Sequence, residues 1–173
     1  MTKHIAFLRG INVGNIRIKM TDLKSAFEQM GYKEVKTWLQ TGNVVFESDQ
    51  SINDLKNTLE KGLSDTFHYK AYVLLYEFAV LADIIAQYPF ERDENHHAYV
   101  VFIEGDAAFE ELRTLSQGLG EEADRVAPGN GVLYWKVKVG ETLDTAFAKT
   151  VAKTKYKRCV TVRNINTLEK MAE

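Results

Sequence analysis

The residues best suited to chemistry lie near the N-terminus, in the stretch FLRGINVGNIRIKM from Phe7 to Met20. This stretch combines two glycines, two asparagines and three basic side chains. Gly10 and Gly14 permit positive φ and close approach of the backbone to a ligand, and asparagine amides bond either backbone or ligand. Backbone N–H groups together with basic side chains can hold an anion. We therefore predict an anion-binding loop at this place.

The second half of the loop has a pattern of its own. Ile16, Ile18 and Met20 alternate with Arg17 and Lys19. Because side chains of an extended chain point to alternate sides, one side should anchor on apolar surface while the other carries the two bases. The spacing is not that of a P-loop, which needs G-x-x-x-x-G-K-[ST]. The alternative is that the glycines and asparagines only turn the chain and that the bases are solvated.

A second candidate lies at Arg163 and Asn164, where a predicted strand meets a predicted helix. Asn164 suits the N-cap, and Thr167 at the third helical position could return a hydrogen bond. The functional alternative is an anion site at this helix N-terminus with Arg163 beside it. If the two distant ends of the chain meet, Arg9, Lys19 and Arg163 clamp one phosphate or carboxylate. The predicted ligand-binding set is Arg9, Asn12, Arg17, Lys19, Gln40, Asn43, Arg163 and Asn164.

Metal and nucleophilic chemistry find less support. His96 and His97 are neighbours on a predicted strand, so their side chains should point to opposite faces and not share a metal easily. The sequence contains no H-x-x-x-H motif and no cysteine pair. We interpret the acidic loop 91–94 as solvated, and Cys159 as a buried structural thiol. We expect no metal and no organic cofactor, and the sequence identifies no catalytic residue.

Charge sets limits on the partner. The formal net charge of −2 argues against bulk electrostatic binding of nucleic acid or membrane. Residues 1–36 nevertheless carry seven bases and three acids, and residues 125–170 carry ten bases and three acids. A basic patch made by these two segments is the alternative to solvated helix faces. The pattern of RNA-recognition strands is missing, and we expect Tyr99 and Tyr134 to pack in the core.

The hydrophobic pattern predicts the elements that position these residues. We predict a strand at 4–8, a helix at 20–30, a hairpin at 35–48, a helix from Ser51 and a strand at 69–77. The hairpin should turn at residues 41–43, and Thr21 and Ser51 are the expected N-caps. This βαββαβ order is that of the ferredoxin-like fold.

The rest of the chain repeats this order. A bridging helix near 77–87, ended by Pro89, leads to predicted elements at 96–105, 106–118, 125–139, 142–154 and 159–163 and a terminal helix from Asn164. Leu143 is expected to face inward. We predict an α+β fold of two ferredoxin-like (α/β-plait) subdomains in tandem, residues 1–76 and 90–173, joined by a bridging helix at 77–89.

The predicted strands are apolar on both faces, as in IAFL, YVLLY, AYVVFI and VLYW. Helices on one face only would leave the second face exposed, which is an association hazard. The cover could be the other half, a partner subunit or a ligand. We favour the other half, and a homodimer through the sheet faces is the alternative.

Composition indicates a cytoplasmic protein. The longest apolar runs are well under the length of a membrane span. The N-terminus has a charge on each side of a very short apolar run, unlike a signal peptide. A single cysteine excludes an internal disulfide and fits a reducing compartment.

Three segments carry a resemblance to a known family. FLRGINVGNIRIKMTDL, LQTGNVVF and TVRNINTLEKM resemble the uncharacterised, mainly bacterial domain-of-unknown-function family 1697. The resemblance implies a pair of ferredoxin-like subdomains and no established activity. Family members often have glycine where this chain has Asn15, and tryptophan where it has Ile165. The family's marked positions correspond here to Arg9, Gly10, Asn12, Gly14, Gln40, Gly42, Asn43, Arg163, Asn164 and Thr167.

These observations favour a binding protein for an anionic ligand, either a phosphate-bearing metabolite or a nucleic-acid backbone. One alternative is an enzyme that uses the same cleft, for which the sequence offers no general base with suitable neighbours. Another is a structural or interaction module that joins subunits through its apolar sheet faces.

Overall fold

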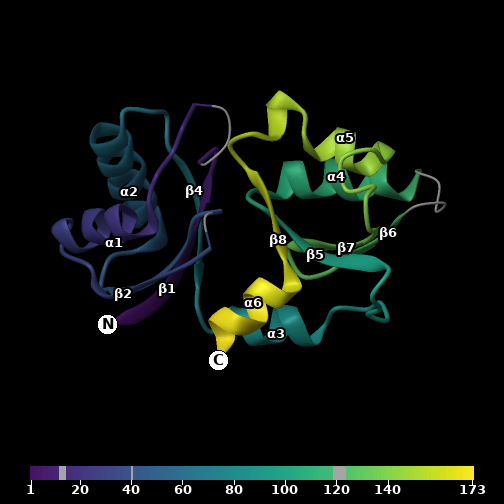
Figure 1. Ribbon diagram of the computed structural model, residues 1–173, viewed down its shortest axis with the longest axis horizontal. Helices are drawn as coiled ribbons and strands as arrows, with labels where there is room; N and C mark the ends of the chain where they lie inside the picture. The colour runs from purple at the N-terminus through teal and green to yellow at the C-terminus, as the bar shows by residue number, and fades with distance from the viewer. Residues whose placement is uncertain (12–14, 40, 119–123) are drawn as a thin grey trace. The chain divides into compact units, whose positions relative to one another are not determined.

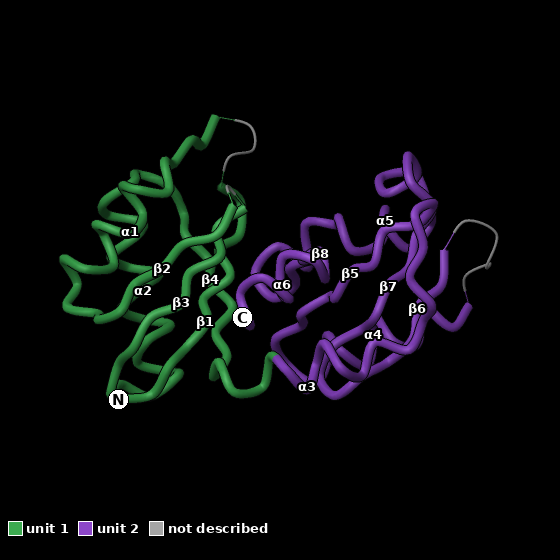
Figure 2. The backbone as a smooth tube through the Cα atoms, turned by 60° about the horizontal axis from the view of Figure 1, so that its bottom comes forward, with its two compact units in different colours: residues 1–81 green, residues 82–173 purple. Residues whose placement is uncertain are grey.

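The chain folds into two compact units, which are described separately. The computed structural model describes residues 1–11, 15–39, 41–118 and 124–173. Unit 1 is Met1–Leu81 and unit 2 is Ala82–Glu173 (Figure 2). The division falls inside helix α3 (Val80–Ala86), within the predicted bridging segment 77–89.

Unit 1 has the predicted ferredoxin-like order. Its elements are β1 (Thr2–Arg9), α1 (Met20–Gln29), β2 (Lys33–Trp38), β3 (Asn43–Ser48), α2 (Ile52–Phe67) and β4 (Tyr72–Glu77). The strands form one antiparallel sheet in the order β2-β3-β1-β4. Helices α1 and α2 cover the same face of that sheet (Figure 1).

The core of unit 1 follows the helical stripes read from the sequence. Helix α1 buries Leu23 and Phe27, and helix α2 buries Leu55, Leu59 and Leu63 at four-residue spacing. These side chains form one cluster with alternate residues of the strands. Full burial of one leucine contributes about 1.5–3 kcal/mol, so burial of the α2 stripe favours docking of this helix on the sheet.

The two predicted helix starts had different outcomes. The Ser51 cap is confirmed, because its Oγ accepts a hydrogen bond from the Asp54 N–H at 3.2 Å. The Thr21 cap is wrong: Lys19 is the N-cap of α1 and makes no side-chain capping bond. Ile18 just before this helix is buried, so apolar anchoring directs the chain into the helix without a polar cap.

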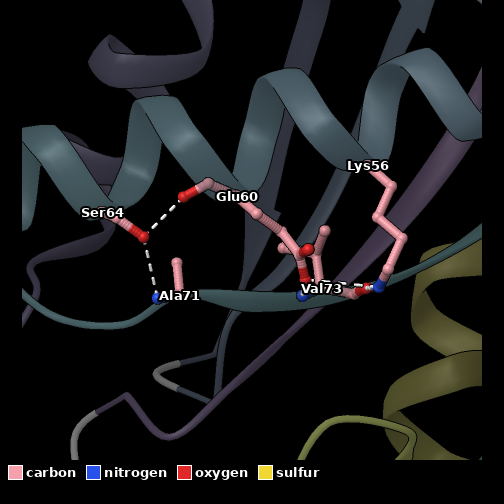
Figure 3. Close-up of polar contacts among 5 residues, drawn as sticks. All are labelled: Lys56, Glu60, Ser64, Ala71 and Val73. Atoms are coloured by element: carbon pink, nitrogen blue, oxygen red, sulfur yellow. Dashed lines mark hydrogen bonds and ion pairs between the residues drawn. The ribbon is translucent and has the colours of Figure 1, made fainter.

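Side chains of α2 satisfy the outer edge of β4, an edge strand of the sheet (Figure 3). Ser64 Oγ accepts from the Ala71 N–H at 2.9 Å. Glu60 Oε2 accepts from the Val73 N–H at 3.0 Å, and Lys56 Nζ donates to the Val73 carbonyl at 2.8 Å. Unpaired edge groups invite pairing with another chain, so this helix protects the edge of unit 1.

Unit 2 repeats the same topology. Its elements after α3 are β5 (His96–Ile103), α4 (Asp106–Gln117), β6 (Asp124–Pro128), β7 (Val132–Lys138), α5 (Ala146–Val151), the 3₁₀ turn η1 (Thr154–Tyr156), β8 (Val160–Asn164) and α6 (Ile165–Ala172). The sheet order β6-β7-β5-β8 matches that of unit 1 position by position. The protein is therefore an α+β pair of ferredoxin-like units, as predicted.

Helix α5 is shorter than predicted. It begins after Thr145, whose Oγ1 accepts from the Ala148 N–H at 3.0 Å. Residues 142–144 form a turn before it, so Leu143 is 83% exposed and the expectation that it faces inward is wrong. Phe147 and Val151, later on the same helix, are buried.

The second face of the unit 2 sheet is covered partly from within the unit. Figure 1 shows α3 and α6 on the side of this sheet opposite α4 and α5. Tyr134 Oη donates to the Ile84 carbonyl at 2.6 Å, and the Tyr134 ring meets the Tyr88 ring edge-on at 5.7 Å. The sequence favours the other half as the cover, whereas α3 and α6 supply part of it in unit 2. Core packing of Tyr134, which is 1% exposed, is confirmed.

Candidate functional site

In unit 1, the ferredoxin-like path brings the predicted loop to one end of the sheet. Strand β1 ends here, α1 begins here, β2 turns into β3 and β4 starts. Arg9 is paired with Tyr72 across β1 and β4, and the Leu8 N–H donates to the Gly42 carbonyl at 2.9 Å. We call this place the Gly10 end, after the glycine that follows β1.

Two glycines shape the Gly10 end. Gly10 has φ +75° and Gly42 has φ +87°, both in the region that favours glycine. A Cβ on Gly42 would lie 2.7 Å from Ile11 Cδ1 and 2.8 Å from Leu8 Cβ. The hairpin turn therefore packs directly against the start of the loop at Ile11, and only glycine at position 42 leaves room for this contact.

Asn43 holds the same turn. Its side chain is fully buried, and Nδ2 donates to the Trp38 carbonyl at 2.9 Å and to Thr41 Oγ1 at 2.8 Å. These two bonds close the β2–β3 turn on itself. The structure thus places Asn43 as a support for the Gly10 end.

The segment 15–19 confirms the predicted alternation. Ile18 is buried in the unit 1 core and Ile16 packs against it, whereas Arg17 and Lys19 are exposed. Neither Arg17 nor Lys19 forms an ion pair with any residue that the structure describes. Two exposed cations therefore lie on an anchored, extended backbone, and Arg17 NH1 donates to the Ile16 carbonyl at 3.1 Å.

Sequence reasoning missed one basic residue at this end. Lys70 immediately precedes β4, and its Nζ lies 5.8 Å from the centre of the Tyr72 ring. The βαββαβ order itself was the available signal, because it places the start of the fourth strand beside the end of the first. Asn12, Gly14 and Gln40 lie outside the described residues.

Arg163 and Asn164 belong to unit 2. Arg163 is 6% exposed, and its NH1 donates to Thr161 Oγ1 at 2.6 Å and to the Val162 carbonyl at 3.0 Å. Asn164 is the N-cap of α6, since its Oδ1 accepts from the Asn166 N–H at 2.8 Å. The N-cap interpretation is confirmed, and the predicted ligand-binding set is divided between the two units.

Asn164 also lines a cavity of about 280 Å³ in unit 2. The cavity lies where the loop before β5 meets the start of α6. Its walls are formed by Arg92, Asp93, Glu94, His96, His97, Ala98, Asn164 and Asn166.

A hydrogen-bonded group stands beside this cavity. Asp93 Oδ1 lies 2.8 Å from His96 Nδ1, and Asp93 Oδ2 lies 3.0 Å from Lys136 Nζ. The hydrogen bonds from His96 and then Lys136 hold the pKa of Asp93 well below its ordinary range. Because an ionised carboxylate only accepts, this contact requires a proton on His96 Nδ1, and in the neutral ring Nε2 is then an acceptor. Sequence reasoning weighed the histidines and the acidic loop separately and missed the group.

A second cavity, of about 340 Å³, lies at the end of unit 2 that corresponds to the Gly10 end. It is bounded by the start of α4 and the β6–β7 turn, and glycines 105, 129 and 131 contribute to its lining. The charged residues here are acidic, Asp106 and Glu110, and Glu110 is paired with Arg113 at 2.7 Å. The same end of the fold is thus basic in unit 1 and acidic in unit 2.

Comparison with known proteins identifies the family. The model of the family described as protein of unknown function (DUF1697) matches residues 1–134. The chain belongs to this family. Among solved structures it is similar to the conserved bacterial protein SP0830 from Streptococcus pneumoniae, with a TM-score of 0.81 and 23% identity over 99% of this chain and 97% of that one. That likeness shows the fold alone, and no curated protein matches the chain.

The structure also bears on the other classes of site for this DUF1697 protein. Within residues 1–11, 15–39, 41–118 and 124–173, no group of three or more histidine, cysteine, aspartate or glutamate side chains could hold a metal ion. In the same ranges no helix has the length and apolarity needed to cross a bilayer. Cys159 is only partly buried, whereas a buried structural thiol was predicted.

Proposed function

We propose that this DUF1697 protein binds an anionic ligand, a phosphate-bearing metabolite or a nucleic-acid backbone, at the Gly10 end of unit 1. The observation that carries the proposal is the anchored segment 15–19. Buried Ile18 and partly buried Ile16 anchor this segment, and Arg17 and Lys19 are exposed with no carboxylate partner among the described residues. The predicted members Asn12 and Gln40 remain part of this proposal, which rests on unit 1 alone.

Preorganisation supports an anion rather than simple solvation of the bases. A flexible basic side chain loses conformational freedom when it binds, but the backbone of residues 16–18 is already fixed by the core. Arg9 and Lys70 add positive charge at the same end. Guanidinium groups suit phosphate and carboxylate geometry because they donate in a planar fork.

An enzyme at the same place is less well supported. Proton transfer needs a positioned acid or base within hydrogen-bonding reach. In the described part of unit 1, no histidine at the Gly10 end is bonded to a carboxylate. An interaction module is the other alternative, and sedimentation velocity tests it: a dimer that dissociates when sheet-face residues are changed would favour that alternative.

The test compares two double variants of equal charge. Arg17→Ala/Lys19→Ala removes the proposed cations, whereas Lys24→Ala/Lys33→Ala removes two exposed lysines on other parts of unit 1. Binding of inorganic pyrophosphate and of a short single-stranded oligonucleotide is measured by calorimetric titration at two salt concentrations. A charge-assisted hydrogen bond contributes about 1.5–3 kcal/mol, and 1.4 kcal/mol is about tenfold in affinity.

The first variant should therefore bind at least about tenfold more weakly, with its melting temperature unchanged, while the second binds like the wild type. Preference for pyrophosphate or for the oligonucleotide distinguishes the two ligand classes. Equal weakening in both variants would reduce the effect to bulk charge and remove the site. Absence of binding by the wild type to either probe would also end the proposal.

A further inference from the structure

The unit 2 cavity holds a histidine–aspartate pair that the anion site does not use. Asp93 is fixed on both sides, because its Oδ1 accepts from the Asn95 N–H at 2.8 Å and its Oδ2 meets Lys136 Nζ at 3.0 Å. Lys136 is only 15% exposed and also donates to the Glu91 carbonyl at 2.6 Å. The carboxylate that orients His96 is therefore held by the sheet as well as by its own loop.

The arrangement matches a base with its positioning partner. Asp93 Oδ1 accepts from His96 Nδ1, which leaves the opposite ring nitrogen, Nε2, able to take a proton. In nucleophile–base sites, a third group that orients the histidine in this way is the recurring feature. His96 is one of the residues that line the cavity, beside the space that a small ligand would occupy.

Two asparagines, Asn164 and Asn166, line the same cavity. The side chain of Asn164 uses Oδ1 to cap α6, and that of Asn166 uses Oδ1 to accept from Arg92. The Nδ2 groups of both asparagines make no hydrogen bond with any residue that the structure describes. Amide donors of this kind stabilise an oxyanion when they are fixed before the reaction.

The charges of the cavity select a neutral substrate. Arg92 is ion-paired with Glu169, and Lys136 is ion-paired with Asp93. Glu94 forms no ion pair within the described ranges, so the surplus charge at the wall is negative. A phosphate or carboxylate would be repelled, whereas a neutral carbonyl would not. The volume of about 280 Å³ lies at the small end of ligand pockets.

We propose that this cavity is a hydrolytic site for a small neutral carboxylic ester, with His96 as general base. Water attacks the carbonyl carbon while His96 Nε2 takes one of its protons, and the carbonyl π electrons move to the oxygen. Asn164 and Asn166 donate to that oxyanion. The intermediate then collapses, the bond to the alcohol oxygen breaks, and the leaving oxygen receives the proton from Nε2. The products are a carboxylic acid and an alcohol, and Asp93 is the positioning residue.

The experiment measures hydrolysis of p-nitrophenyl acetate by the full chain. Release of nitrophenolate over many turnovers separates catalysis from one-time acylation of surface lysines. His96→Gln should lower kcat/KM by about a hundredfold or more, the usual contribution of a general base. His68→Asn removes an exposed histidine of unit 1 and should leave the rate unchanged, since asparagine tolerates the left-handed backbone at that position.

Asp93→Asn provides a second, nearly isosteric variant. It should lower kcat, and ¹⁵N NMR of the imidazole should show His96 leaving the Nδ1–H tautomer, which a merely structural role for Asp93 would not cause. Circular dichroism melting checks that each variant is folded. The proposal is overturned by wild-type turnover no faster than that of His96→Gln, by an equal loss in His68→Asn, or by an unchanged tautomer in Asp93→Asn. None of these outcomes depends on pyrophosphate or oligonucleotide binding.

Discussion

Replacing Gly42 with alanine tests how tightly the hairpin turn supports the Gly10 end. Gly42 has φ +87°, and left-handed backbone at a residue with a Cβ lowers stability by about 1–2 kcal/mol. The new Cβ would also lie 2.7 Å from Ile11 Cδ1 and 2.8 Å from Leu8 Cβ. The isoleucine tip can move, but Leu8 Cβ is attached to the backbone of a central strand. Overpacking of this kind costs about 1–3 kcal/mol, so we expect a total of roughly 2–5 kcal/mol.

Gly31→Ala is the matched control. Gly31 has φ +95°, but nothing lies within 4 Å of the Cβ that would be added. Gly31→Ala should therefore lower the free energy of unfolding only by the conformational cost of about 1–2 kcal/mol. Urea unfolding gives the loss of stability, and hydrogen exchange of the Leu8 amide, which bonds the Gly42 carbonyl, reports on unit 1 directly. If Gly42→Ala costs no more than Gly31→Ala, the close packing beneath the loop is refuted.

Three further outcomes are expected. Glu60→Ala removes the acceptor of the Val73 N–H at the β4 edge, so it should lower the free energy of unfolding by about 1–3 kcal/mol and speed hydrogen exchange of that amide. Asp65→Ala is the control, because it removes an exposed ion pair on the same helix and should lower the free energy of unfolding by under about 1 kcal/mol. The His96 imidazole and the Lys136 ammonium group, both bonded to Asp93, lower the pKa of this carboxyl group. The stabilisation that the ionised Asp93 provides is therefore present above the ordinary carboxyl pKa of about 4 and is lost as pH falls through the lower pKa of the folded state. The melting-temperature difference between wild type and Asp93→Asn should be constant from neutral pH down to about 4 and shrink below that pH. Burial raises the pKa of Tyr88 to about 12, so its contribution to stability should be lost as pH rises from about 10 to 12, and thermal melts of Tyr88→Phe should lack that loss.

Local chemistry explains what could be predicted from the sequence at the Gly10 end. The turn at residues 41–43 follows from a glycine that accepts positive φ and an asparagine that bonds nearby backbone. The anchoring of Ile16 and Ile18 follows from alternation in an extended chain. Each depends on neighbours within a few positions, so pattern alone was sufficient.

Other features depended on residues far apart in the chain. Lys136 lies on β7 and reaches Asp93 in the loop before β5, a contact that requires the register of the sheet to be known. Leu143 continued the apolar stripe of a predicted helix, but the turn at 142–144 delayed the start of the helix until Thr145 could cap it. A stripe shows which face a helix would bury and does not fix the residue at which it starts.

The duplication shows why the fold alone does not identify the ligand. In unit 1, β1 ends next to Gly10, and in unit 2, β5 ends near Gly105; both glycines have positive φ. Both units also bring a Gly-Asn hairpin turn to this end. Unit 1 places Arg17 there, and unit 2 places Asp106. The shared backbone places loops at the same end of both units, and the side chains decide the sign of the charge at that end. Function in this protein must therefore be argued for each unit from its own side chains, and the two proposed sites need not share a substrate.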